Sequence, residues 1–427
     1  MAKLIVHGGN PLKGTVIPAG NKNSILALIP ATILCNAPVK FTNVPSSTSV
    51  RIMLEIYSKL GGKVTEIDSK TFELDSTSLD KYTVDETLAI KERASYMFLG
   101  PLLKKFGTAE IVDAGGCRLG NRPVDTLFQG LIEMGVVFNQ SDTKYSFSVN
   151  ELTPKPVIWL LEASVTGTEN LILTATLCKG KTVIYNAACE PHVQDLCNFI
   201  NSVGGNIKGV GTNRLEIDGV ETLRGGSWNI ISDHIDIGGL IVGAAITKGE
   251  VLIKNAIPEH MTQILKFFEK LNLKVEIRGD DIFVPSNQDL YAKVNIKGDI
   301  DKINDLPWPG FPVDLVPEAL TLALAARGSI RIYSTLYENQ LMYVEELKKL
   351  GAQVIMADPH RVITFGATKF KPGNIVSPEI IQCAYSMFLC CLAANGKSVI
   401  NNVDSIYRRF PELVEQYASL GAKLEKE

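Results

Sequence analysis

The segment DAGGCRLGNRPVD, residues 113–125, combines the residue types needed for thiol and anion chemistry. Cys117 lies between two glycines and two arginines, Arg118 and Arg122, and Pro123 stiffens the end of the segment. Glycines let a backbone approach a ligand closely, and neighbouring cations favour the thiolate over the thiol. The segment therefore predicts a reactive cysteine beside an anion site. The alternative is a buried structural cysteine on a glycine turn, because free cysteines usually behave as small hydrophobic residues.

Hydrophobic patterning places this segment between a strand and a helix. The preceding run GTAEIVDA has a β-branched Ile-Val pair near its end, which is typical of a short strand. The following run has apolar residues at helical spacing, at Leu127, Leu131 and Met134. Cys117 is therefore expected on a loop that joins a strand to a helix.

The composition is typical of a globular protein with two domains. The 427 residues are too many for one ordinary core, and the chain is 45% hydrophobic and 21% charged. The formal net charge is −3, without a run of lysines or arginines, so neither nucleic acid nor an anionic membrane is expected as a partner. The most apolar stretch, residues 25–35, contains Pro30 and is too short to span a membrane. The N-terminus does not resemble a secretory signal.

Eight cysteines are scattered along the chain, and they show neither zinc-ligand spacing nor a disulfide framework. This usage is typical of a protein in the reducing cytoplasm, and no metal site is expected. The cysteines are Cys35, Cys117, Cys178, Cys189, Cys197, Cys383, Cys390 and Cys391.

A short pattern, a helix-like segment that ends near Leu-Gly and continues into a strand, occurs six times. A second pattern precedes each copy: a glycine or proline, a β-rich run and then a polar loop. Together they predict a unit of helix, strand, loop, helix and strand, with further strands at FELDS, LEIDG and DIFVP. The six copies are SKLGGKV (58–64), IEMGVVF (132–138), NSVGGNI (201–207), EKLNLKV (269–275), KKLGAQV (348–354) and ASLGAKL (418–424).

Six such units divide naturally into two globular domains of three. A solenoid is the alternative, but solenoid repeats are usually shorter than this unit. Polar residues fall into register where the strands end, at Cys117, Glu190, Glu259 and Glu338, and Arg408 follows the sixth strand. Loops at one end of such units are expected to face a shared cleft, where ligands bind.

These residues resemble the enolpyruvyl transferases, in particular those that act on UDP-N-acetylglucosamine. The resemblance implies an α/β fold: an inside-out α/β barrel with two domains, each of three βαβαββ units with the helices inside. One domain, residues 22–232, is inserted into the other, residues 1–21 plus 233–427, and the ligands bind between domains that close. The segments that carry the resemblance are GNKNSILAL (20–28), GGCRLGNRPVD (115–125), EPHVQDLCNFI (190–200), PWPGFPVDL (307–315) and YENQLMYVEELKKLGA (337–352).

The resemblance implies transfer of the enolpyruvyl group of phosphoenolpyruvate to the 3-hydroxyl of UDP-N-acetylglucosamine, with release of phosphate. This addition and elimination is the first committed step of peptidoglycan synthesis, and it uses no cofactor or metal. Phosphoenolpyruvate and a UDP-sugar are therefore the expected partners. Fosfomycin, a phosphoenolpyruvate mimic, is the expected covalent inhibitor at Cys117.

Alternative functions stay open at this point. One is a paralogous transferase that acts on UMP or another uridine nucleotide, as in nucleoside antibiotic pathways. Another is a non-catalytic nucleotide-sugar sensor, although an intact Cys117 argues against it. The RNA 3'-phosphate cyclases share a related repeat but use a nucleophilic histidine, and no histidine here lies in such a motif. The 3-phosphoshikimate enolpyruvyl transferases lack this cysteine loop.

In the first half of the chain, the resemblance assigns Lys22 to phosphoenolpyruvate, Asn23 to the sugar and Arg93 to the cleft. Lys22 also precedes an apolar helix, and a helix start beside a lysine suits a phosphate. Cys117 is implied as the general acid that protonates the methylene carbon of phosphoenolpyruvate. The other expected contacts are Arg122 and Pro123 with phosphoenolpyruvate and the uracil ring, Val124 and Asp125 with the nucleotide, and Ser164 and Val165 with the diphosphate.

In the second half, Asp314 is implied to lie over the sugar 3-hydroxyl, as a base or an orienting group. Without the resemblance, an aspartate after a proline-rich turn would be read as a helix cap. Arg408 is expected at a C-terminal arginine position of the catalytic site. Leu336, Glu338 and Asn339 are expected to line the cleft.

Four positions depart from the family pattern. Glu162 replaces a lysine beside the expected diphosphate contact, and Gln340 replaces an arginine. Ile381 or Gln382, depending on the alignment, replaces an arginine that binds phosphoenolpyruvate. Ser49 replaces an aspartate.

The lost cations predict compensation elsewhere in the chain. Loss of a bidentate anion contact costs on the order of a few kcal/mol, so three such losses should not be silent. Arg409, Arg361 and Lys348 are the candidates for a replacement cation.

Overall fold

The computed structural model describes residues 2–115 and 123–427. These residues form two compact units, each with its own hydrophobic core. Unit 1 contains residues 2–19 with 232–427, and unit 2 contains residues 20–115 with 123–231. The predicted residues Cys117, Arg118 and Arg122 lie outside the described part of the chain.

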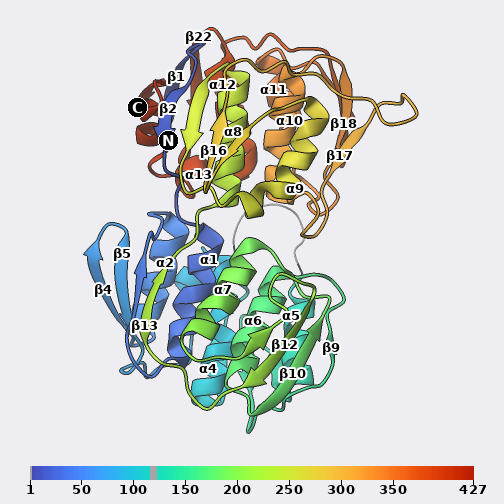
Figure 1. The fold of residues 1–427 in the computed structure, drawn as a ribbon. Helices are drawn as coiled ribbons and strands as arrows, with labels where there is room; N and C mark the ends of the chain where they lie inside the picture. Colours follow the sequence, from blue (N-terminus) through green and yellow to red (C-terminus); the bar gives the residue numbers. More distant parts are fainter. Residues whose placement is uncertain (1, 116–122) are drawn as a thin grey trace. The chain divides into compact units, whose positions relative to one another are not determined.

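Unit 1 contains three four-stranded sheets around a group of buried helices (Figure 1). Its strands are β1 (Lys3–Gly8), β2 (Lys13–Val16), β14 (Glu250–Ile253), β15 (Glu276–Arg278), β16 (Asp281–Val284), β17 (Lys302–Asn304), β18 (Ser329–Tyr333), β19 (Val354–Asp358), β20 (Arg361–Phe365), β21 (Asn374–Val376), β22 (Gly396–Asn401) and β23 (Lys423–Lys426). Its helices are α8 (His234–Ile246), α9 (Pro258–Phe268), α10 (Val316–Ala325), α11 (Val344–Lys349), α12 (Ile381–Ala393), α13 (Asp404–Tyr407) and α14 (Leu413–Ser419), with 3₁₀ turns η3 (Glu269–Leu271) and η4 (Val313–Leu315).

Unit 2 contains two four-stranded sheets and one three-stranded sheet. Its strands are β3 (Val39–Thr42), β4 (Lys63–Asp68), β5 (Thr71–Asp75), β6 (Thr108–Ile111), β7 (Val137–Gln140), β8 (Tyr145–Ser148), β9 (Ile158–Trp159), β10 (Gly180–Tyr185), β11 (Ile207–Lys208), β12 (Arg214–Gly219) and β13 (Gly226–Asn229). Its helices are α1 (Lys22–Ala31), α2 (Thr48–Lys59), α3 (Glu86–Ala89), α4 (Leu99–Phe106), α5 (Asp125–Glu133), α6 (Val165–Thr176) and α7 (Pro191–Ser202), with 3₁₀ turns η1 (Thr32–Leu34) and η2 (Arg93–Phe98).

Five of the six sheets share one strand order. In the sheet β17-β18-β20-β19, the first two strands are parallel and α10 connects them, and the other pairs are antiparallel. This is the βαβαββ order that the resemblance implies. The sixth sheet, β6-β8-β7, lacks the first strand, and a single parallel bridge between Thr83 and Glu110 stands in its place.

The first helix of each repeat in unit 1 is buried on all sides. α8, α10 and α12 pack against one another, and in Figure 1 they run between β1 and β22 on one side and β17 and β18 on the other. Their sequences are mostly apolar around the whole helix, as expected of a helix without a solvent face, with buried acids at Asp236 of α8 and Glu318 of α10. Gly239 of α8 permits the contact with α12, because a Cβ there would lie 2.2 Å from the Tyr385 ring.

The predicted inside-out barrel is therefore shown only in part. Helices lie inside and sheets outside, but the sheets of the described residues are separate and none of them closes into a barrel. Each sheet keeps two edge strands, and several of these edges are only two to four residues long. Short edges of this kind limit pairing with further strands.

The glycine in the repeated pattern ends a helix in the left-handed conformation. Five copies place a glycine there, with φ between 87° and 111°, and the fourth places Asn272 at φ 57°. Glycine adopts this conformation without strain, and asparagine tolerates it better than most residues. The glycines are Gly61, Gly135, Gly204, Gly351 and Gly421.

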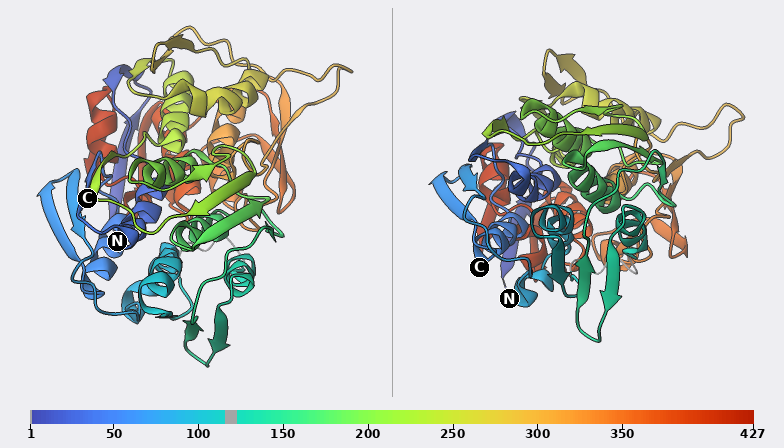
Figure 2. Two further views of the ribbon diagram at one scale, coloured as in Figure 1. Left: turned by 60° about the horizontal axis from the view of Figure 1, so that its bottom comes forward. Right: turned by 90° about the horizontal axis from the view of Figure 1, so that it is seen from below.

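Two further features complete the description of the fold. The connection between β16 and β17 projects from the body of unit 1 in all three ribbon views (Figures 1 and 2), and Ile296 on it is fully exposed. Within the described ranges, no helix has both the length and the apolar character needed to cross a bilayer.

Candidate active site

The parallel pair in each sheet determines where the predicted site residues lie. The first helix of a repeat begins after the first strand, and the second strand ends at the same edge because the two strands are parallel. Helix starts and the loops that follow the second strands therefore gather at one edge of each sheet. Polar groups at such edges have free backbone N–H groups beside them.

In unit 2, Lys22 is the first residue of α1, and Asn21 caps the helix by accepting a hydrogen bond from the Ser24 backbone N–H at 3.1 Å. Lys22 and Asn23 are both partly buried. Gly20 precedes them in close contact with the chain after β3: a Cβ there would lie 1.8 Å from the Asn43 carbonyl oxygen. The backbone that presents Lys22 is thus fixed by a position that only glycine fits.

Arg93 is the first residue of η2, which continues into α4, and it contacts the start of the α5 segment. Its Nη2 donates to the Pro123 carbonyl oxygen at 3.2 Å, and the guanidinium lies 5.8 Å from the Tyr96 ring centroid. The Tyr96 hydroxyl donates to Asp113 at 2.9 Å and accepts from the Ala114 N–H at 3.1 Å. The two flanks of the 116–122 segment are therefore both held by η2, and the structure brings Arg93 and Pro123 together.

The starts of α5 and α6 carry the remaining predicted contacts of this half. Val124 is the residue before α5, and Asp125 is its first residue. Ser164 caps α6 by accepting from the Gly167 N–H at 3.2 Å, and Val165 is the first residue of that helix. The α5 and α6 helices pack against each other, so the structure brings these four residues to neighbouring helix ends.

Glu162, the acid in place of the expected lysine, is bonded to the start of α5. Its Oε1 accepts from the Thr126 hydroxyl at 3.3 Å, and its backbone carbonyl accepts from the Ser164 N–H at 2.7 Å. A carboxylate near the first turn of a helix interacts favourably with the helix dipole. This contact explains how the acid is accommodated, but it also leaves a negative charge beside Ser164.

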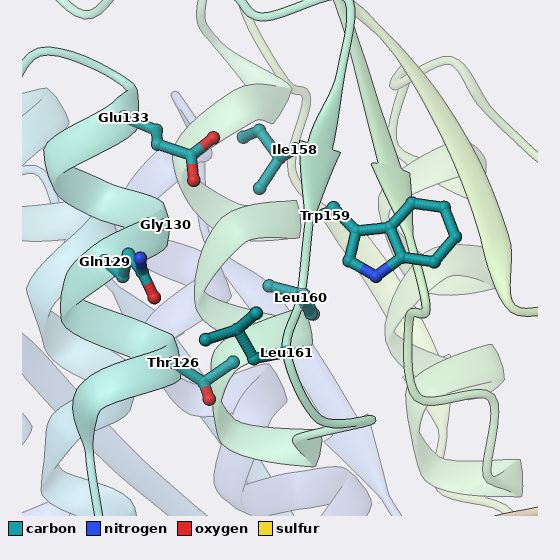
Figure 3. A pocket seen from close by; sticks show the side chains of 8 residues that line it. All are labelled: Thr126, Gln129, Gly130, Glu133, Ile158, Trp159, Leu160 and Leu161. Carbon is teal, nitrogen blue, oxygen red and sulfur yellow. The ribbon is translucent and has the colours of Figure 1, made fainter.

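A shallow pocket lies between α5 and β9, close to these helix starts (Figure 3). Thr126, Gln129 and Glu133 line it from α5, opposite Ile158 on β9, and the Trp159 indole points away from the helix (Figure 3). Trp159 instead stacks on Tyr185 with ring centroids 5.6 Å apart.

Two buried acids of unit 2 were not predicted from the sequence. Asp195 on α7 accepts from the Ser24 hydroxyl and, at 3.0 Å, from the Trp228 indole N–H, and burial raises its pKa to about 6. Glu169 on α6 is fully buried, and burial together with the charge of Glu190 raises its pKa well above the usual value. Periodicity alone marks both as core positions and does not separate an acid there from an apolar residue.

In unit 1, the predicted Asp314 lies in η4, directly before α10, and it does not cap the helix. Its Oδ2 is 3.7 Å from Nη1 of Arg409, whose Nη2 donates to Asp233 Oδ2 at 2.6 Å. Asp233 caps α8 by accepting from the Ile235 N–H at 2.9 Å. The Arg409 guanidinium thus links two carboxylates that stand at the starts of two buried helices.

Electrostatics differ sharply among these buried groups. Burial raises the pKa of Asp233, but Arg409, His234 and a backbone N–H outweigh it, so the net pKa lies below the usual value. Burial lowers the pKa of His234 to about 4. Glu318, one turn after Asp314 on α10, is fully buried, and burial raises its pKa well above the usual value.

The loop after β18 carries the other predicted residues of unit 1. Leu336, Glu338 and Asn339 are all exposed on it. Asp305, which the sequence analysis did not single out, holds the base of this loop: its carboxylate accepts from the Thr335 N–H and hydroxyl and from the Leu336 N–H, at 2.8 to 2.9 Å. Asp305 follows β17, so its position at a strand end was the signal that could have identified it.

Gln340, which replaces an arginine, is a buried structural residue. Its amide nitrogen donates to the Val313 carbonyl at 2.8 Å, and its amide oxygen accepts from the Ser334 hydroxyl. It therefore braces the residue next to Asp314. A side chain with these bonds does not reach a ligand.

The position of the lost phosphoenolpyruvate arginine is uncharged and buried. Ile381 and Gln382 begin α12, and both are buried. An open pocket of about 350 Å³ lies beside them, and it is lined by Asn339, Met342, Tyr343, Pro378, Glu379 and Ile380. Ser49, the fourth departure, is buried in the first turn of α2.

The three candidates for a replacement cation lie in different environments. Arg361 pairs with Asp358 at 2.5 Å, and Lys348 pairs with Glu345 at 2.7 Å, both on the surface. Arg409 is buried and faces Asp314. Arg408 follows α13 and is partly buried.

The described cysteines contrast with the predicted role of Cys117, which lies outside the described residues together with Arg122. All seven are buried and unpaired in disulfides. Burial raises the pKa of Cys35 to about 12, of Cys189 to about 11 and of Cys391 to about 12. Thiols of this kind are inert at neutral pH.

Comparison with known proteins places these features in a family. The family model described as EPSP synthase (3-phosphoshikimate 1-carboxyvinyltransferase) matches residues 6–417. The UDP-N-acetylglucosamine 1-carboxyvinyltransferase of Borrelia garinii subsp. bavariensis is 37% identical over 426 residues, which cover 100% of this chain and 99% of that protein. The protein of the same name from Treponema denticola is 37% identical over 425 residues, with 100% and 99% covered.

Two solved structures share the fold at low sequence identity. The enolpyruvyl transferase NikO from Streptomyces tendae superposes with a TM-score of 0.88 at 20% identity, covering 100% of this chain and 98% of that one. EPSP synthase from Acinetobacter baumannii superposes with a TM-score of 0.76 at 17% identity, with 100% of both chains covered.

Proposed function

The chain belongs to the EPSP synthase family of carboxyvinyl transferases, and from this premise we propose that it transfers the enolpyruvyl group of phosphoenolpyruvate to the 3-hydroxyl of UDP-N-acetylglucosamine. Phosphate is the second product. The reaction is the first committed step of peptidoglycan synthesis. The full-length similarity to relatives that bear the name of this reaction supports the choice of acceptor.

The observation that carries the proposal is the set of helix starts in unit 2. Lys22, Arg93 and Val165 are each the first residue of a helical segment, and Ser164 caps one of them. Helix N-termini offer unpaired N–H groups and a positive dipole end, and the two cations add full charge. Substrates with a phosphate, a carboxylate and a diphosphate suit such a surface.

Chemistry in the proposed reaction is divided between the named residues. Cys117 delivers a proton to the methylene carbon of phosphoenolpyruvate, which makes carbon 2 electrophilic. Asp314 orients the sugar 3-hydroxyl or takes its proton as the oxygen attacks carbon 2. The tetrahedral ketal then loses phosphate from carbon 2 and one proton from its new methyl group, which restores the carbon–carbon double bond. Fixed positive charge from Lys22 and Arg122, with Arg408, stabilises the departing phosphate.

The test is phosphate release from phosphoenolpyruvate with purified protein and UDP-N-acetylglucosamine. Release is expected with the wild-type chain and not with Cys117→Ala, whose folding is checked by circular dichroism. A wild-type chain that binds both substrates but releases no phosphate would contradict the proposal.

A second candidate acceptor is UMP or another uridine nucleotide. It is favoured by the acid Glu162 beside Ser164 in unit 2, which reduces positive charge where a diphosphate is expected. In unit 1, the neutral, inward-facing Gln340 replaces a further cation. The same assay run with UMP distinguishes the two, because release with UMP and not with the nucleotide sugar would select this acceptor. A cytoplasmic location, expected from the cysteine usage, stays a prediction.

A further inference from the structure

Arg409 is the buried cation closest to the proposed base. Its side chain is only 3% exposed, and its guanidinium bonds Asp233 at 2.6 Å while facing Asp314 at 3.7 Å. Its Nε is buried, and no hydrogen-bond partner is found for it among residues 2–115 and 123–427. The guanidinium is hydrogen-bonded to Asp233 and only faces Asp314. It can therefore hold the Asp314 carboxylate in position without a direct hydrogen bond to it.

We infer that Arg409 is a positioning residue for Asp314, and that it holds this carboxylate in the orientation needed to meet the acceptor hydroxyl. The inference rests on the proposed function, because only that function gives Asp314 a hydroxyl to orient. Arg409 does not touch substrate in this assignment. It acts through Asp314.

The anchor on Asp233 makes this arrangement rigid. Asp233 is itself fixed as the cap of α8, with Oδ1 on the Ile235 N–H and Oδ2 on Arg409. A side chain held by a helix cap has little rotational freedom, so the second guanidinium nitrogen keeps a defined place beside Asp314. Lysine carries a compact charge on a flexible stem, so it does not offer two donors in fixed, separate directions as the guanidinium does.

Asp314 is also held from its other side. The residue before it, Val313, accepts the Gln340 amide N–H at 2.8 Å. Gln340 thus restrains the backbone of η4 while Arg409 restrains the carboxylate. The departure at Gln340 and the buried Arg409 are therefore parts of one local arrangement around Asp314.

Asp233 and Asp314 are the two carboxylates that the Arg409 guanidinium faces. Two further acids, Glu318 and Asp236, are fully buried near the pair, and burial raises the pKa of each. Arg409 is therefore the cation that faces the Asp314 carboxylate from within the same unit.

The other candidate cations do not fit this role. Arg361 and Lys348 are engaged with Asp358 and Glu345 on the surface, where ion pairs contribute little. Arg361 therefore provides the matched control for an arginine substitution. An Arg361→Gln variant is expected to keep wild-type turnover.

The experiment is a double-mutant cycle on turnover, with Arg409→Gln, Asp314→Asn and the double variant in the full chain. Arg409→Gln is expected to lower kcat about 100-fold, the effect of misplacing a reacting group by about 1 Å, with KM for phosphoenolpyruvate changed less than about threefold. In the Asp314→Asn background, Arg409→Gln is expected to change kcat by less than about threefold, because the residue acts through Asp314. Arg409→Lys is expected to have less than about a tenth of wild-type kcat, because lysine keeps the positive charge but lacks the planar guanidinium that orients Asp314.

The size of the Arg409→Gln effect in the two backgrounds decides the inference. Equal (additive) losses of kcat with Asp314 and with Asn at that position would overturn it and assign Arg409 a structural role. If Arg409→Gln lacks the native near-ultraviolet circular dichroism signal, the same cycle with Arg409→Lys decides, and the same non-additivity is expected. Wild-type protein that releases no phosphate would end the proposed function and this inference together, whereas active wild-type protein with additive losses would end the inference alone.

Discussion

The two units repeat one βαβαββ plan but place opposite charges at the starts of their buried helices. In unit 2, Lys22 and Arg93 begin α1 and η2, and the caps Asn21 and Ser164 are neutral. In unit 1, the corresponding helix starts carry Asp233 and Asp314 before α8 and α10, and Ile381 begins α12. The contrast is clearest between α1, which begins with Lys22 after a neutral cap, and α8, which is capped by the Asp233 carboxylate.

The difference teaches how one fold can supply two kinds of chemistry. A helix N-terminus favours an anion, and in unit 1 this preference is satisfied internally, because the Asp233 carboxylate accepts the Ile235 N–H of its own helix. In unit 2 the caps of α1 and α6 are uncharged, so at these two helix starts the preference for an anion is left for a ligand, whereas the Glu92 carboxylate caps η2 by accepting the Ala94 N–H at 3.2 Å. We therefore expect unit 2 to bind the anionic parts of the substrates and unit 1 to act on the hydroxyl.

Fosfomycin provides the largest expected effect, because it joins an anionic group to a thiol-reactive centre. We predict one adduct per chain, at Cys117, with complete loss of phosphate release and no adduct on Cys117→Ala. The seven described cysteines should stay unmodified, since they are buried and burial raises the pKa of Cys35, Cys189 and Cys391. Intact-mass spectrometry followed by peptide mapping is the measurement. An adduct on any of these seven cysteines would contradict the prediction that Cys117 alone is reactive.

Charge removal at a unit 2 helix start should follow in size. Lys22→Gln is expected to lower kcat/KM for phosphoenolpyruvate about 100-fold, or about 3 kcal/mol, because a charge-assisted contact at a helix N-terminus is lost. Initial rates at varied phosphoenolpyruvate measure it. The control is Lys63→Gln, an exposed lysine on β4, which should change the rate less than about twofold. Equal effects of the two variants would contradict the assignment of Lys22, at the start of α1, to phosphoenolpyruvate.

Glu162 is an acid beside the neutral Ser164 cap of α6, and reversing its charge should sharpen the comparison. Glu162→Lys is expected to lower KM for the nucleotide sugar about three- to tenfold, because an exposed charge pair contributes about 1 kcal/mol. Glu133→Lys, which makes the same charge change at the other end of α5, is the control. Titrations at high salt should reduce the gain, since exposed charges are screened. An increase in KM would show that the acid serves the acceptor.

The smallest effect concerns a feature that the two units share. Glu169 and Glu318 are both buried in central helices with a raised pKa, so each holds a proton in the fold that the unfolded chain loses above the ordinary value of 4.5. Their contribution to stability is therefore present at low pH and is lost as pH rises from that value toward the raised pKa. Glu318→Gln should raise Tm by about 2 to 5 °C at about pH 8 and have little effect at about pH 5.

Differential scanning calorimetry at both pH values tests this prediction. Glu55→Gln, an exposed glutamate on α2, is the control and should leave Tm unchanged at either pH. Glu169→Gln should behave like Glu318→Gln. A pH-independent change at Glu318 would mean that the carboxyl group is ionised in the fold.

Much of the fold could be predicted from the sequence because the signals are local. Helix ends with glycine, β-rich runs and their spacing predicted a repeated unit of helix, strand, loop, helix and strand. The resemblance supplied the full βαβαββ order, which five sheets have. The three-stranded sheet β6-β8-β7 could not be predicted to be incomplete. Its first strand is reduced to the single bridge at Thr83, and no hydrophobic run in the sequence marks that loss. Closure into a barrel came from the resemblance alone, and the separate sheets do not show it.

The site was less accessible to sequence reasoning, because its contacts join distant residues. Arg409 and Asp233 are 176 positions apart, and only their folded positions reveal the pair. Gln340 looked like a lost ligand contact, whereas its bonds to Val313 and Ser334 turn it inward. The roles of the residues at the helix starts stay predictions until the substitutions above are measured.

The left-handed residue that closes one helix of each repeat has a consequence for the ancestry of the chain. If the six units descend from one duplicated segment, side-chain identity has drifted in every copy, and even the glycine has been exchanged for Asn272 in the fourth. The positive φ angle has persisted in all six. What the duplication preserved is a backbone angle, so a comparison of torsion angles should detect relatives of this segment that residue matching overlooks.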